Sequence, residues 1–223
     1  PGPIIDSHLD GIRSALSGLD PVAVLVTHTH PDHAPAANGI ADEYAVPALG
    51  FSPGPEFSPD RLIADGERIG FGTAEAECLT TPGHTPDSVC YRIGDTLFSG
   101  DHIMGGSTVV VEDMAQYLTS LRRLHGIGLE ALYPGHGPVI DAPDALISEY
   151  IAHRLDREEQ IISAIARGAE TLGEIVTKVY RDVDPVLHPV AAMSVGAHLR
   201  KLVVEERVVT DEDPRWDSPV ALP

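Results

Sequence analysis

The sequence predicts an α+β fold in two parts: a strand-and-helix domain over residues 1–141 and a smaller, mainly helical domain over residues 142–223. Three observations support this prediction. In the first part, short apolar runs end in turns that contain glycine or proline. From about residue 144 onward, apolar residues recur at helical spacing. The 21 glycines and 19 prolines are spread along the chain rather than gathered in a repeat, which fits many tight turns.

Four potential metal ligands lie within six residues, directly after the first strand-like run (residues 22–26). His28 and His30 are two apart and point the same way if extended geometry persists. Asp32 and His33 follow on a proline turn and can point elsewhere. A single histidine is more often a surface or core residue than a ligand, but packing gives no reason to gather three imidazoles and a carboxylate. The cluster therefore predicts a metal site, and its two pairs suggest two neighbouring ions.

Further candidate ligands follow three later strand-like runs: His84 after residues 76–80, Asp101 after residues 95–99, and His136 after residues 129–133. Each stands at a turn with glycine, which lets the backbone approach a site closely and direct the next side chain. One histidine at such a turn is weak evidence, whereas three strand-end ligands after a first cluster are strong. His102, beside Asp101, is an ambiguous candidate.

These residues resemble the pattern of the metallo-β-lactamase superfamily, H-x-H-x-D-H followed in order by H, D and H. The resemblance implies an αββα sandwich for residues 1–141 and a binuclear metal centre. It assigns the ligands as follows: His28, His30 and His84 to one ion, Asp32, His33 and His136 to the other, and Asp101 as the bridge. Imidazole and carboxylate without thiolate suit zinc, although the set also tolerates iron or manganese.

The resemblance also favours hydrolysis, because members with flavin-linked di-iron redox chemistry usually carry Glu where this chain has His30. Two zinc ions about 3.5–4 Å apart can hold a bridging hydroxide at neutral pH and polarise a carbonyl or phosphoryl oxygen. We expect Asp32 to orient that hydroxide or handle its proton, besides ligating a metal. Relatives of this fold have several strands before the point at which this chain begins, so we expect N-terminal strands to be missing from it.

The second part has the outline of a winged helix. A helix is expected from residue 144 to about 168, a second follows the capping box Thr171-Leu-Gly-Glu174, and a third opens at Pro189. The apolar face of the third is expected to include these residues: Val190, Met193, Val195, Leu199, Leu202 and Val203. A short strand at 207–210 and a turn complete the pattern. The alternative is a plain helical cap. DNA binding is not expected, since the basic residues 198–201 are followed by Glu205 and Glu206.

Residues 98–102 and 133–139, the pair His153-Arg154 and the winged helix together resemble the lactamase-β-like-2 family. That family includes a zinc-dependent endoribonuclease of single-stranded RNA, so the resemblance implies this activity. With 15 basic and 34 acidic residues, the net charge of −19 opposes the approach of RNA. A glyoxalase II type hydrolase of a small ester or thioester is therefore a second hypothesis. A non-enzymatic winged-helix protein with a structural metal is a third, disfavoured because structural zinc sites are closed and four-coordinate.

The remaining sequence features predict a cytoplasmic protein. No apolar run is long enough to cross a bilayer, and no signal peptide is visible. Cys78 and Cys90 each lie within an apolar strand-like run, which favours buried thiols over a disulfide and so a reducing compartment.

Overall fold

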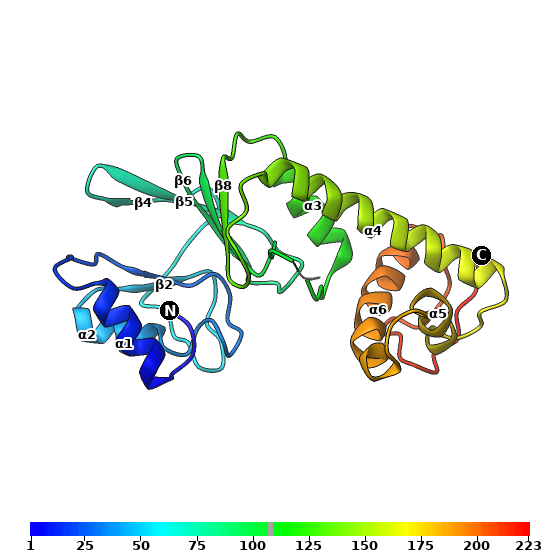
Figure 1. The fold of residues 1–223 in the computed structure, drawn as a ribbon. Coiled ribbons are helices and arrows are strands. Elements are labelled where there is room, and N and C mark those ends of the chain that lie inside the picture. Colours follow the sequence, from blue (N-terminus) through cyan, green and yellow to red (C-terminus); the bar gives the residue numbers. More distant parts are fainter. Residues whose placement is uncertain (107–108) are drawn as a thin grey trace. The chain divides into compact units, whose positions relative to one another are not determined.

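The computed structural model describes residues 1–106 and 109–223 and divides the chain into two compact units (Figure 1). The first unit comprises residues 1–81, 87–106 and 128–143, and the second comprises residues 82–86, 109–127 and 144–223. Both units are therefore assembled from segments that are distant in the sequence. The prediction of a mixed α and β fold is confirmed.

The first unit contains two sheets. The three-stranded sheet is parallel, in the order β1 (Val24–Leu25), β2 (Ala48–Gly50) and β3 (Arg61–Leu62). The five-stranded sheet runs in the order β4 (Arg68–Phe71), β5 (Ala74–Thr80), β6 (Val89–Ile93), β7 (Thr96–Gly100) and β8 (Ala131–Pro134). Its pairs are antiparallel from β4 to β7 and parallel between β7 and β8.

Apolar side chains fill the space between these sheets and between the first sheet and its helices. One buried cluster joins Leu49 of β2 to Cys78 of β5 and Tyr91 of β6, so the two sheets face each other. A second cluster packs helices α1 (Asp6–Ala15) and α2 (Ala37–Tyr44) against the three-stranded sheet (Figure 1). The order of layers in this unit is thus helix, sheet, sheet.

The second unit is built from helices. They are α3 (Met114–Leu124), α4 (Pro143–Ala166, whose first residue belongs to the first unit), α5 (Leu172–Val179), a short 3₁₀ helix η1 (Pro185–Leu187) and α6 (His188–Val204). One buried cluster connects α4, α5 and α6 through Ile161, Ile175 and Leu199. As the sequence predicts, Thr171 caps α5 by accepting a hydrogen bond from the backbone N–H of Glu174 (3.2 Å).

Three local expectations differ from the structure. The run 22–26 is a strand only at Val24–Leu25. The strand expected at 207–210 contributes only an isolated bridge, Val209 to Ala221. The apolar face predicted for α6 is wrong at its start, because Val190 and Met193 are 50% and 55% exposed. The buried cluster reaches α6 at Ala191 and then from Val195 onward, so Val190 and Met193 lie on a side of the first turns that this cluster does not cover.

Cys78 and Cys90 are buried and form no disulfide, as expected. Burial raises the pKa of the Cys78 thiol to about 11, which keeps it protonated at neutral pH. Within the described part of the chain, none of the helices has the length and apolar character needed to span a bilayer.

Candidate metal centre

The segment that carries the first four candidate ligands is fixed at several points of the first unit. The Tyr91 hydroxyl donates to a main-chain carbonyl just beyond β1 (2.6 Å). The backbone N–H of Thr29 donates to the Asp87 carboxylate (2.9 Å), and that of His33 donates to the carbonyl of His30 (3.0 Å). These bonds turn the chain sharply between the two pairs of candidates. Asp87, which is 58 residues away in the sequence, therefore holds the Thr29 end of this turn in place.

Asp32, His33 and His136 form one compact group of potential ligands. His136 Nε2 lies 3.1 Å from Asp32 Oδ2 and 3.2 Å from His33 Nε2. His33 Nε2 lies 3.6 Å from Asp32 Oδ2. The turn after β1 and the end of β8 thus bring together side chains that are more than one hundred residues apart.

Asp101, at the end of β7, forms a second group with His28 and His33. Its Oδ1 lies 3.2 Å from His33 Nε2, and its Oδ2 lies 3.5 Å from His136 Nε2. Burial alone would raise the pKa of Asp101, but the hydrogen bond with His33 and the charges of His136 and His28 hold it below its usual value. Gly135 makes this approach possible, because a Cβ there would lie 2.4 Å from Asp101 Oδ1.

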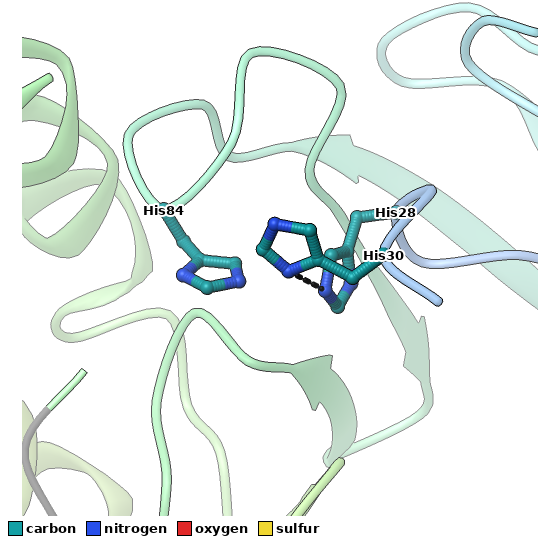
Figure 2. Close-up of side chains that lie close together, drawn as sticks. All are labelled: His28, His30 and His84. Carbon is teal, nitrogen blue, oxygen red and sulfur yellow. Dashed lines mark hydrogen bonds between the residues drawn. The ribbon is translucent and has the colours of Figure 1, made fainter. Parts of the chain in front are cut away.

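His28, His30 and His84 form a third group, in which the ligand nitrogens lie within 4.8 Å of one another. Figure 2 shows the three imidazoles turned toward one another, with His28 Nε2 and His30 Nδ1 at 3.1 Å. His84 is carried by the loop between β5 and β6, which the Thr81 N–H closes by donating to the carbonyl of Ser88 (2.8 Å).

The His84 ring is oriented by backbone rather than by a side chain. Its Nδ1 donates to the carbonyl of Val110 (2.7 Å), so its Nε2 carries the lone pair that a metal would need. The adjacent Val109 carbonyl accepts a bond from Arg154 Nη2 (2.8 Å). Gly83 allows the loop to pack closely, since a Cβ there would lie 2.4 Å from Tyr117 Cα. The carbonyl of Val110 gave no signal in the sequence, because any residue presents the same group.

The structure therefore brings all seven candidate ligands into three overlapping groups. His102, the ambiguous candidate, is 1% exposed and belongs to none of the three groups found among the described residues.

Comparisons with known proteins identify the family of this chain. The sequence profile of the metallo-beta-lactamase superfamily matches residues 5–61 and 50–136. The chain belongs to this superfamily. The profile of the beta-lactamase associated winged helix domain matches residues 171–216, which confirms the winged helix.

Two relatives match over most of their length. The chain is 34% identical to a beta-lactamase-like protein 2 homolog from Drosophila melanogaster, over 91% of this chain and 75% of the relative. It is 30% identical to a homolog of the same name from Caenorhabditis elegans, over 97% of this chain and 76% of the relative. A beta-lactamase domain protein from Burkholderia ambifaria has the same fold, with a TM-score of 0.84 over 100% of this chain and 81% of that one at 22% identity.

The superfamily uses metal ions, and the side chains present here fit that requirement. A neutral imidazole carries only one N–H, yet His33 Nε2 faces Asp32, Asp101 and His136 at 3.2–3.6 Å. One proton cannot satisfy three such neighbours, whereas a cation placed among their lone pairs can. Asp101 and His28 are also buried, at 8% and 2% exposure, and a buried carboxylate requires a compensating charge.

Proposed function

We propose that this chain is a metal-dependent hydrolase with a binuclear zinc centre. The observation that carries the proposal is the convergence of seven imidazole and carboxylate side chains into three overlapping groups. The ligand sets follow these groups: His28, His30 and His84 for one ion, Asp32, His33 and His136 for the other, and Asp101 shared between them. Imidazole and carboxylate ligands without thiolate suit zinc, and iron or manganese would use the same atoms.

When bound, two such ions would supply an activated water and a positive charge that stabilises the negative charge developing on a carbonyl or phosphoryl oxygen. The protein's own contribution is to hold the imidazoles in one tautomer and to accept a proton. The Val110 carbonyl fixes the tautomer of His84 by accepting a hydrogen bond from its Nδ1.

Asp32 is the proposed proton acceptor. Its side chain is 54% exposed, so it can meet a water molecule and a substrate, whereas the Asp101 side chain is only 10% exposed. The contact of Asp32 Oδ2 with His136 Nε2 fixes the carboxylate. We therefore assign Asp32 to orienting the attacking water and receiving its proton, and Asp101 to ligation alone.

Single-stranded RNA is the proposed substrate, supported by the resemblance to the lactamase-β-like-2 family along the chain. A small ester or thioester is the second candidate, favoured by the net charge of −19. The winged helix adds little support for nucleic acid binding. In α6, Lys201 pairs with Glu158 and Glu205 at 2.9 Å, and Arg200 Nη2 donates to the carbonyl of Glu112 (2.8 Å).

Parallel assays of the zinc-loaded protein on single-stranded RNA and on an acyl thioester test these proposals. Asp32→Asn should lower the activity by about 10²–10⁴-fold, because it removes the proton acceptor while keeping the side-chain size. Asp42→Asn on α2 is the matched control, since Asp42 is exposed and lies in none of the three groups. RNA left intact at high enzyme concentration, with the thioester cleaved, would rule out the first substrate. Elemental analysis should find two zinc ions per chain, and one or none would contradict the binuclear centre.

A further inference from the structure

A pocket of about 320 Å³ lies within the second unit and includes none of the seven candidate metal ligands. Its basic lining residues are His153, Arg154 and Arg157 of α4, and its apolar wall includes Val110, Leu187 and Val190. The volume falls at the lower end of the range for small-molecule sites, roughly 300–1,000 Å³.

The charge of this pocket is opposite to that of the chain. No Asp or Glu stands among the described residues that line it, although the sequence has 34 acidic residues against 15 basic ones. Glu158 follows Arg157 directly, but its carboxylate pairs with Lys201 (2.9 Å) and Arg207 (3.8 Å). Neither Arg154 nor Arg157 forms an ion pair within the described ranges.

Three buried polar atoms of the lining residues have no hydrogen-bond partner in the part of the chain that the structure describes: Arg154 Nε, Arg157 Nε and Ser194 Oγ. Arg154 is only 3% exposed and uses Nη2 on the carbonyl of Val109. Arg157 uses Nη1 on Gln160 Oε1 (2.9 Å) and stacks over the Tyr180 ring, 4.2 Å from its centroid. These three atoms are too enclosed to meet a ligand directly, but they leave this side of the pocket short of hydrogen-bond acceptors. Arg154 Nη1 and Arg157 Nη2 make no hydrogen bond within the described residues, and these are the guanidinium donors that a ligand in the pocket can meet.

The basic and apolar residues that line the pocket suit a ligand with one negative charge and an apolar body. Two guanidinium groups supply positive charge, but each already uses part of its donor set, which leaves few for a doubly charged phosphate. His153 adds no full charge near neutral pH, since burial and the two arginines lower its pKa. On the other side, the half-exposed Leu187 and Val190 offer apolar contact.

We propose that this pocket binds a small organic carboxylate, with its carboxylate against Arg154 and Arg157 and its hydrocarbon body against Val110, Leu187 and Val190. The carboxylate would accept hydrogen bonds from Arg154 Nη1 and Arg157 Nη2, which make none within the described residues. A bound charge would also offset the cost of burying the Arg154 guanidinium. This proposal does not depend on the substrate of the metal centre.

Isothermal titration calorimetry of the zinc-loaded protein with octanoate tests it, with 1-octanol and inorganic phosphate as comparison ligands. Octanoate should bind at least tenfold more tightly than either, because only it has both the charge and the hydrocarbon body. Arg157→Gln should raise the Kd for octanoate by roughly tenfold or more, because it removes a hydrogen bond to a charged group. Arg122→Gln makes the same charge change at an exposed position of α3 and should leave binding unchanged.

Arg157 is the better probe, because Arg154 also holds the carbonyl of Val109 and its loss could unfold the unit. Melting temperature and zinc content are measured for every variant, so that binding lost through unfolding or through loss of metal is distinguished from binding lost at the pocket. Octanoate binding that Arg157→Gln leaves unchanged would overturn the proposal. Absence of octanoate binding, or equal binding of 1-octanol or inorganic phosphate, would overturn it as well.

Discussion

Replacing Gly83 by alanine should destabilise the second unit and displace the loop that carries His84. Gly83 has φ +139°, a conformation that L residues rarely adopt, and its added Cβ would lie 2.4 Å from Tyr117 Cα and 2.6 Å from Tyr117 N. Both atoms belong to the backbone of α3, where Tyr117 is fully buried. Neither the loop nor the helix can relieve the contact by changing a side-chain rotamer.

Two costs add to give the expected loss of unfolding free energy in Gly83→Ala. The backbone conformation costs about 1–3 kcal/mol for a residue with a side chain. The overlap with α3 costs about 1–3 kcal/mol more, the usual range for overpacking a core. Gly66 provides a matched control, because it has φ +74° but none of the described heavy atoms lies within 4 Å of the position that an added Cβ would occupy. Gly66→Ala should therefore cost only the conformational term, about 1–3 kcal/mol.

Thermal unfolding of the two variants measures the difference. For a chain of this size, 1 kcal/mol shifts the melting temperature by about 2–4 °C, so Gly83→Ala should melt several degrees below Gly66→Ala. If His84 is a ligand, Gly83→Ala should also bind about one zinc ion fewer per chain, whereas Gly66→Ala should keep the wild-type content. Equal melting temperatures for the two variants would refute the steric argument.

Further predictions concern stability. Removing metal with a chelator should lower the unfolding free energy by about 4 kcal/mol if zinc was present at a thousand times its Kd, and a calorimetric scan without any such shift would count against the centre. Glu158→Gln should cost about 3 kcal/mol in denaturant unfolding, since it removes one partner of a buried ion pair, whereas Glu159→Gln at an exposed neighbour should cost far less. Burial lowers the pKa of His198 below 6.5, so the unfolded chain binds more protons; stability should be full above pH 6.5 and fall as pH drops through the folded pKa, visible as an acid-side decline in melting temperature. Thr171→Ala should cost about 1 kcal/mol through loss of the α5 cap, against a negligible change for the exposed Thr119→Ala.

Local features could be predicted from the sequence because their causes are local. The helix expected from residue 144 to about 168 is α4 (Pro143–Ala166), and the capping box at Thr171 begins α5. The resemblance and the winged helix are confirmed by the matching family profiles. The domain boundary near residue 142 and the cytoplasmic location stay predictions.

The sequence alone determined which side chains could bind metal and that each follows a strand-like run, because residue type and turn chemistry can be read from a few neighbouring positions. Only the tertiary structure decided which ligand atoms meet, as in the approach of His33 to His136 across 103 residues. It also decided that the Val110 carbonyl orients His84 and that Arg154 and Arg157 line a pocket whose described residues include no carboxylate. Such contacts depend on long-range packing and on backbone groups that every residue type shares, so no local pattern records them.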